Sequence, residues 1–145
     1  MNNVQRAEEI ATKAHEGTFR RDGVTPYIVH PRAVAAMVDT EEEKIVAWLH
    51  DVLEDTTTTQ FDLMHHPRLL LSDCELCCLE SLVHLVWQSY EEYIAEIVYL
   101  HKRDGWYQSA INVKIADIVC NLSDNPTEKQ KKKYYKALKI LAGAE

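Results

Sequence analysis

The 145-residue sequence has few residues that interrupt helices, because it contains only four glycines and four prolines. Helices can therefore form along most of the chain, and we expect an all-α protein. It also lacks any run of 18 or more apolar residues that could span a bilayer, and no N-terminal apolar stretch resembles a signal peptide. We therefore expect a cytoplasmic protein with no membrane partner.

Cysteine and positive charge are also scarce. The four cysteines, three of them within residues 74–78, are too few and too clustered for a secreted disulfide framework. The formal net charge of −7 argues against duplex nucleic acid as a partner, because such binding needs a positive surface. A small anionic substrate is still compatible with this charge, since a bound metal ion can reverse the local field. The length and the 46% hydrophobic content predict one globular domain over residues 1–145.

Apolar residues recur at helical spacing along almost the whole chain. The expected helices cover residues 3–16, a segment opening at Ile28, a continuous stretch from Thr40 to the threonines at 56–59, one turn at 61–64, and segments 73–87, 90–100, 106–122 and one after Pro126. Thr40 and Glu43 have the spacing of a capping box, which predicts a helix start there. Residues 18–27 are expected to form a loop, because Gly23 and Pro26 favour turns.

The stretch from Trp48 to Thr56 is the main candidate for chemistry. At about 100° per residue, its apolar residues lie on one helix face and its polar residues on the other. The polar face consists of His50, Asp51, Glu54 and Asp55. Imidazole nitrogen and carboxylate oxygen are ligands for divalent cations, and a cation would relieve the repulsion among three carboxylates. A solvated helix face is the alternative, but four such groups directly after an apolar run favour a metal site.

Two other helices carry isolated polar residues among apolar ones. His30 follows an apolar pair at a helix start, and Asp117 lies within an apolar helix with Lys114 and Asn121 on the same stripe. The structural alternatives are a hydrogen-bonded packing histidine and a surface ion pair between Lys114 and Asp117. Combined with His50 and Asp51, these residues provide two imidazoles and two carboxylates, which suits one Mn²⁺, Fe²⁺ or similar ion.

Two further groups of residues have structural interpretations. Cys74-x-x-Cys77 has the spacing of a zinc ligand pair, but no second pair lies at ligand spacing, and reduced cysteine is common in protein cores. The lysine-rich run at 129–133 is interpreted as a solvated surface.

The order H…HD…D resembles the signature of the HD-domain metal-dependent phosphohydrolases. The likeness extends to the (p)ppGpp hydrolases, which comprise the hydrolase half of the RelA/SpoT-type proteins and the small alarmone hydrolases. The segments that carry it are Ala14-His15, Arg20-Arg21-Asp22-Gly23, Pro26-Tyr27-Ile28-Val29-His30-Pro31, Leu49–Thr56 (LHDVLEDT), and Val113–Asp117 (VKIAD) with Asn121-Leu122. These motifs span residues 14–122.

The resemblance implies a single-domain, all-α bundle of HD type that contains Mn²⁺ or another divalent transition metal. The implied metal ligands are His30, His50, Asp51 and Asp117, the implied catalytic residues that position and activate water are Glu54 and Asp55, and the implied substrate-binding residues are Arg20, Arg21, Lys114 and Asn121. Arg20 would pack on the guanine base, although Arg20 and Arg21 could exchange roles. The implied reaction converts ppGpp or pppGpp to GDP or GTP and pyrophosphate by hydrolysis of the 3′-pyrophosphate, an activity of the stringent response.

The chain departs from the family pattern at Ile118 and Cys120, where an arginine and a histidine are usual, so its substrate can differ. One alternative is an HD phosphatase for another nucleotide, such as the 2′-phosphate of NADPH or a nucleoside monophosphate. Another is a nucleotide-binding regulator without turnover, although such a protein would not need the water-activating pair Glu54 and Asp55.

Overall fold

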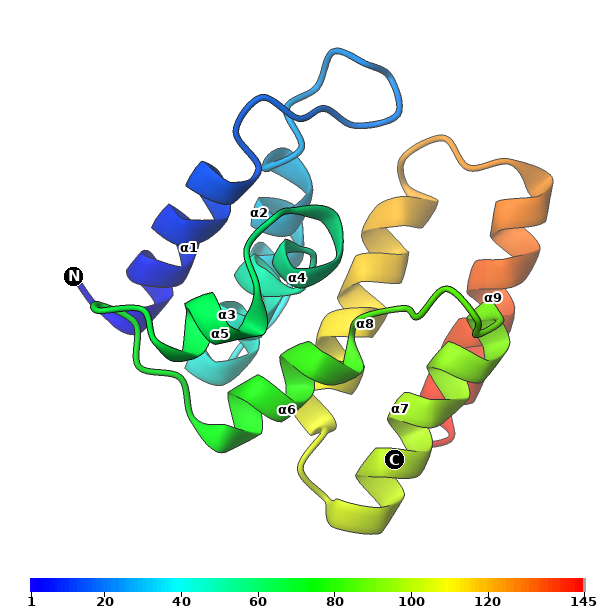
Figure 1. The fold of residues 1–145 in the computed structure, drawn as a ribbon. Helices are drawn as coiled ribbons and strands as arrows, with labels where there is room; N and C mark the ends of the chain where they lie inside the picture. The colour runs from blue at the N-terminus through cyan, green and yellow to red at the C-terminus, as the bar shows by residue number, and fades with distance from the viewer. Residues whose placement is uncertain (145) are drawn as a thin grey trace.

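The structure, a computed structural model, describes residues 1–144, and over these residues it contains nine α-helices and no β-strand beyond an isolated bridge between Phe19 and Pro26 (Figure 1). The helices are α1 (Asn3–Ala14), α2 (Val29–Ala36), α3 (Glu41–Leu49), α4 (Val52–Asp55), α5 (Gln60–Met64), α6 (Asp73–Ser81), α7 (Tyr90–Asp104), α8 (Gln108–Leu122) and α9 (Glu128–Ala142). The predicted all-α fold class is confirmed. None of these helices is both long enough and apolar enough to cross a membrane.

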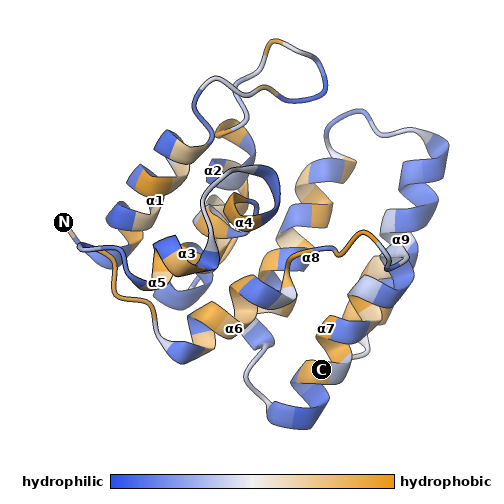
Figure 2. Ribbon diagram, in the orientation of Figure 1, coloured by the Kyte–Doolittle hydropathy of each residue, from blue (hydrophilic) through white to orange (hydrophobic). Residues whose placement is uncertain are grey.

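Helix α8 joins two groups of helices. On one side it packs against α2 and α3, and α3 in turn packs against α1; on the other side it packs against α7 and α9 (Figure 1). One buried hydrophobic cluster runs through both groups, and it includes the fully buried Leu49, Ile94 and Ile118. Hydrophobic segments accordingly line the inner sides of the helices (Figure 2). The central position of α3 and α8 brings residues from distant parts of the sequence together.

Side chains at the helix starts define most helix boundaries. At α3 the Thr40 Oγ1 accepts a hydrogen bond from the Glu43 backbone N–H at 3.0 Å, and Glu43 Oε1 accepts one from the Thr40 N–H at 3.0 Å. This confirms the predicted capping box, and a cap of this kind contributes about 1 kcal/mol to stability. The same reciprocal pattern begins α1, α5, α6, α7 and α9.

The helix predicted to continue through His50 and Asp51 is interrupted there. Helix α3 ends at Leu49, and α4 is a separate single turn that begins at Val52. The His50 ring donates from Nδ1 to the Ala47 carbonyl, which is the acceptor that a continuing helix would use at this point. His50 and Asp51 therefore lie at a break between helices, not along one helix face.

The helix predicted over residues 73–87 is also too long. Helix α6 ends at Ser81, and residues 82–89 form a connection to α7. The Tyr93 hydroxyl donates to the Leu82 carbonyl at 2.7 Å, and the His84 backbone N–H donates to Glu54 Oε2 at 3.3 Å. These long-range hydrogen bonds replace the local ones that would extend the helix, and they place the connection beside Glu54.

Candidate active site

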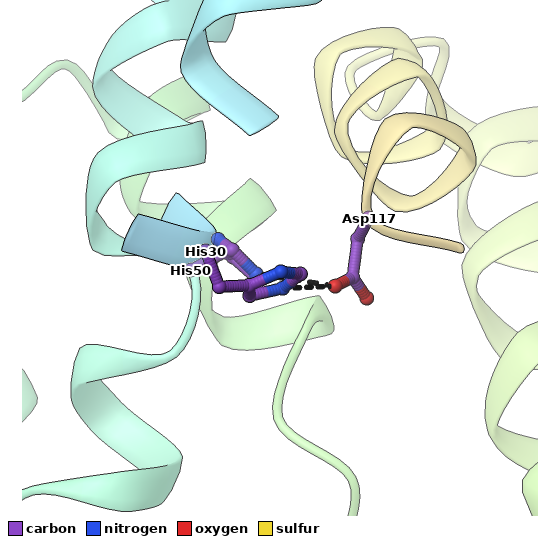
Figure 3. A group of neighbouring side chains, drawn as sticks. All are labelled: His30, His50 and Asp117. Atoms are coloured by element: carbon purple, nitrogen blue, oxygen red, sulfur yellow. Dashed lines mark hydrogen bonds and ion pairs between the residues drawn. The ribbon is translucent and has the colours of Figure 1, made fainter. Parts of the chain in front are cut away.

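Three buried polar side chains from separate elements meet at the centre of the molecule. His30 comes from the first turn of α2, His50 from the end of α3, and Asp117 from the middle of α8 (Figure 3). One ligand atom from each lies within 4.8 Å of the other two, and all three residues are buried. His30 Nε2 is 2.7 Å from Asp117 Oδ1, and His50 Nε2 is 3.6 Å from the same oxygen. These three predicted ligands could hold one metal ion.

The predicted fourth ligand, Asp51, lies beside this cluster. Its Oδ2 is 3.1 Å from His50 Nε2 and 3.8 Å from His30 Nε2. Although these atoms are close, His50 Nε2 is buried and has no hydrogen-bond partner among the described residues. Because Nδ1 donates to Ala47, the unpartnered Nε2 is the nitrogen that is available to a metal ion. The donor set therefore fits a divalent cation.

The electrostatics of the cluster also favour a positive charge at its centre. Burial opposes a charge on His50, but Asp51 and Asp117 outweigh this and raise the His50 pKa well above its ordinary value. Burial would raise the Asp51 pKa, yet the neighbouring His50 and the Tyr27 hydroxyl bring it to about 2. The Asp117 pKa is likewise well below its usual range despite burial, because Lys114 and the imidazoles favour the carboxylate. The lowered pKa values keep Asp51 and Asp117 as carboxylates, the form that coordinates a cation.

The predicted catalytic pair, Glu54 and Asp55, lies on the single turn α4 immediately after Asp51. Partial burial, together with neighbouring carboxylates that include Asp51, raises the pKa of both side chains. The polar face predicted on one continuous helix is wrong for His50 and Glu54, because the helix break separates them. The turn nevertheless keeps both carboxylates on the solvent side of the cluster, where water can reach them.

Two residues of the site carried no predicted role. The Tyr27 hydroxyl lies 2.7 Å from Asp51 Oδ2 and 3.2 Å from Asp55 Oδ2, so it links the ligand candidate to the catalytic candidate. The His15 ring lies against the Tyr27 ring at a centroid distance of 4.8 Å, tilted by 35°, and its buried Nε2 has no hydrogen-bond partner among the described residues. Burial and the neighbouring histidines lower the His15 pKa. Both residues lie within the sequence motifs quoted above, which was the available signal.

The predicted substrate-binding residues lie around the same cluster. The Lys114 Nζ is 2.7 Å from Asp117 Oδ2, so the alternative of an ion pair is correct, but the pair is buried and not on the surface. Asn121 links Asp117 to Arg20, since its Nδ2 donates to Asp117 Oδ1 at 3.3 Å and its Oδ1 accepts from Arg20 at 3.2 Å. The fold thus brings these three predicted residues to one edge of the cluster.

The two arginines of the 20–23 loop differ in their surroundings. Arg20 also pairs with Asp124 at 2.8 Å, its guanidinium lies 5.7 Å from the centre of the Tyr27 ring, and its side chain is only 14% exposed. Arg21 donates to the Asp124 carbonyl at 3.0 Å and is 48% exposed. Arg20 therefore has the fixed orientation, whereas Arg21 faces solvent.

A hollow of about 210 Å³ borders this arginine loop and reaches His30. Cys120, which stands where the resembled family has a histidine, lines it together with Arg20 and Asp124. Ile118, the other departure, is fully buried in the hydrophobic core. The substitution at 120 thus alters the wall of a hollow beside the cluster, whereas the one at 118 contributes to packing.

An all-helical fold with a buried His/His/Asp cluster at the junction of its helices defines the structural class of this protein. A solved structure described as a metazoan orthologue of SpoT that hydrolyses ppGpp has the same fold, with a TM-score of 0.71 over 99% of this chain and 85% of that chain, at 20% sequence identity. No protein-family model matches the chain.

Sequence similarity to named proteins covers a shorter segment. The chain is 48% identical over 58 residues to guanosine-3′,5′-bis(diphosphate) 3′-pyrophosphohydrolase of Haemophilus influenzae, over 37% of this chain and 8% of that protein. It is 42% identical over 64 residues to the bifunctional (p)ppGpp synthase/hydrolase SpoT of Escherichia coli, over 41% of this chain and 9% of that protein. The corresponding pyrophosphohydrolase of Aquifex aeolicus is 47% identical over 60 residues, over 39% of this chain and 8% of that protein. The matches therefore cover less than a tenth of each relative, and within that segment they confirm the predicted resemblance.

Proposed function

We propose that this protein is an HD-domain phosphohydrolase that cleaves the 3′-pyrophosphate of ppGpp or pppGpp, with GDP or GTP and pyrophosphate as products. The names of the similar proteins and the shared fold support this proposal. The observation that carries it is the buried cluster of His30, His50 and Asp117 with an unpartnered imidazole nitrogen, flanked by an acidic turn.

We infer that His30, His50, Asp51 and Asp117 hold one divalent transition metal, Mn²⁺ being the expected ion. Mixed nitrogen and carboxylate donors suit such an ion. When bound, it would lower the pKa of a coordinated water and neutralise phosphate charge. Lys114 would hold Asp117 in place through their contact of 2.7 Å.

Glu54 and Asp55 would position the attacking water and accept its proton. A carboxylate with a raised pKa is a better base near neutral pH than an ordinary one. Glu54 Oε2 accepts a hydrogen bond from the His84 backbone N–H, which fixes the orientation of the Glu54 side chain. The Tyr27 hydroxyl would orient Asp55 in the same way through its contact of 3.2 Å.

The cations around the cluster would bind the nucleotide. The Arg20 guanidinium is oriented by Asn121 and Asp124, so it can stack on a purine without losing these hydrogen bonds. Lys114 and Arg21 would interact with phosphate oxygens. Because these cations lie at one edge of the site, a phosphorylated purine nucleotide fits despite the overall charge of −7.

The test is incubation of Mn²⁺-loaded protein with ppGpp, NADPH and nucleoside monophosphates, with pyrophosphate and phosphate measured separately. We expect ppGpp to yield GDP and pyrophosphate. Release of a single phosphate from NADPH or a monophosphate, with ppGpp left intact, would favour the other HD phosphatases. Binding of nucleotide without any turnover would favour the regulator.

Variants of the arginine loop make this test more specific. Arg20→Ala should raise the KM for ppGpp much more than it lowers kcat, because base stacking is present in both the bound substrate and the transition state. Arg21→Ala is the matched control, since it changes the neighbouring cation that faces solvent. A larger KM effect in Arg21→Ala would reverse the roles of the two arginines.

A further inference from the structure

Lys133 on α9 has a different environment from its neighbours in the lysine-rich run. Its Nζ lies 4.4 Å from the centre of the Tyr90 ring and 4.9 Å from that of Tyr134. Within residues 1–144 no carboxylate lies within 4 Å of this ammonium group, whereas Lys131 pairs with Glu128 at 3.1 Å. Lys133 is exposed, as predicted for residues 129–133, but its ammonium group also lies against two aromatic rings.

Tyr90, at the start of α7, has an unusual hydroxyl group. The oxygen is buried and has no hydrogen-bond partner in the described part of the chain. Buried polar groups are normally hydrogen-bonded, so this hydroxyl can donate to a ligand atom that comes close to it. Two ammonium groups approach the same ring, since Lys114 Nζ is 5.7 Å from its centre. The start of α7 lies beside α9 in Figure 1.

The positive charge of Lys133 has no carboxylate partner within 4 Å among residues 1–144. Partial burial and the nearby Lys114 and Arg21 lower the Lys133 pKa, and Asp117 opposes this effect only in part. Asp117 already pairs with Lys114 at 2.7 Å and with His30 at 2.7 Å. Lys114 is thus balanced by Asp117 and Arg21 by Asp124, whereas Lys133 has no carboxylate within 4 Å among residues 1–144.

This place is connected to the candidate metal cluster through a single pair of residues. Asp117 faces His30 with one carboxylate oxygen and Lys114 with the other. Lys114 in turn lies 5.1 Å from the centre of the Tyr93 ring and near Tyr90. Lys114 therefore lies between the cluster and the Tyr90 ring that Lys133 also approaches.

We propose that Lys133 and the Tyr90 hydroxyl bind a phosphoryl group of the substrate other than the one at the His30, His50 and Asp117 cluster. This proposal rests on the proposed function and adds a basis for selectivity: the protein distinguishes nucleotides phosphorylated at two positions from those phosphorylated at one. The ammonium group supplies charge, and the hydroxyl donates a hydrogen bond to a phosphate oxygen.

The test compares the binding of guanosine 3′,5′-bisphosphate and guanosine 3′-monophosphate by titration calorimetry in the presence of Mn²⁺. Lys133→Gln should weaken bisphosphate binding by about tenfold, the scale of a charge-assisted hydrogen bond, and leave monophosphate binding unchanged. Lys132→Gln is the matched control, because it removes the same charge from the adjacent residue of α9. Equal bisphosphate affinity in the wild type and Lys133→Gln, or equal losses in the two lysine variants, would overturn the proposal.

Tyr90→Phe removes only the hydroxyl. Because this group has no protein partner, the substitution should leave the unfolding temperature unchanged or raise it, while bisphosphate affinity falls by a few-fold. A variant with lower stability and unchanged affinity would show that the hydroxyl has a structural role only, and would overturn its part in the site.

Incubation of the same samples with ppGpp separates the two proposals. Pyrophosphate release by the wild type, with bisphosphate affinity unaffected in Lys133→Gln, would overturn the phosphate site and keep the hydrolase. Bisphosphate binding that depends on Lys133 without cleavage of ppGpp would keep the phosphate site and overturn the alarmone activity.

Discussion

Two groups of residues in this protein have side chains that commonly bind metals, and their surroundings differ. His30, His50 and Asp117 come from three separate helices and direct their ligand atoms toward one point. Cys74, Cys77 and Cys78 come from one helix, α6, and all three are reduced. The first group is brought together only by folding, whereas the second is already close in the sequence.

The hydrogen bonding of the two groups explains the difference. The His50 Nε2 atom has no partner among the described residues. The Cys74 and Cys78 Sγ atoms, by contrast, both lie close to the Trp106 carbonyl, at 3.0 and 3.5 Å, and donate to it. Burial raises the Cys78 pKa to about 12, which disfavours the thiolate that zinc requires. Residue type alone therefore indicates a metal site poorly, and unsatisfied ligand atoms that converge from separate elements indicate it better.

The largest expected effect comes from removal of an imidazole of the first group. His50→Ala should lower metal affinity by more than about 100-fold, because even residues that only support a ligand contribute 10–100-fold. Elemental analysis of protein purified without chelator measures the bound metal. Cys74→Ala is the control and should keep wild-type metal content. One metal ion per chain in His50→Ala would contradict the assignment.

Glu54→Gln is expected to have the next largest effect. It should lower kcat for ppGpp by about 10²-fold while metal content and KM change little, the usual scale for a positioned acid–base group. Exposed Glu80→Gln serves as the control. An unchanged kcat in Glu54→Gln would assign proton acceptance to another group.

The pH dependence of the wild-type enzyme gives a second measure of Glu54. Partial burial and the neighbouring Asp55 and Asp51 raise its pKa. The base must be deprotonated, so kcat should fall as pH drops through this raised pKa, above the ordinary value of about 4.3. Glu54→Gln should lose this acidic limb.

Tyr27→Phe should have a moderate effect. The ring keeps its packing against His15, but Asp51 and Asp55 lose the hydroxyl that lies between them. Metal affinity should fall by about tenfold, the lower end of the range for residues that support a ligand. Tyr93→Phe is the control, since its hydroxyl donates to the Leu82 carbonyl and not to these carboxylates. Equal metal affinity in the wild type and Tyr27→Phe would exclude a supporting role.

The smallest effect is expected at the cysteines. A thiol reagent should label the buried Cys78 slowly and release no metal from folded protein, because the thiol is protonated and its bond to Trp106 is internal. Labelling rates by mass spectrometry and metal release by a colorimetric chelator measure both. Release of one zinc ion per chain on modification would show that the cysteines of α6 bind metal as well, and would contradict the difference drawn between them and the His30, His50 and Asp117 cluster.

The sequence by itself determined the helical fold class, the capping box at Thr40 and the three residues that meet in the candidate metal site. The fold class follows from the local periodicity of apolar residues, and the capping box from two side chains three residues apart. The candidate site follows from the side-chain chemistry of His30, His50 and Asp117. A charged residue within an apolar helix needs a partner, so Asp117 could be identified as a candidate site residue from the sequence alone.

Only the tertiary structure decided where the helices end and which other residues join the site. At the break after α3, the Ala47 carbonyl accepts a hydrogen bond from the His50 ring, and α3 packs against α8 there. Tyr27 and Lys133 acquire their roles in the same way, because the carboxylates and rings they approach belong to distant segments. Local sequence patterns carry no information on the contacts of Tyr27 with Asp51 and of Lys133 with Tyr90, since each joins residues whose separation in the chain far exceeds the period of a helix.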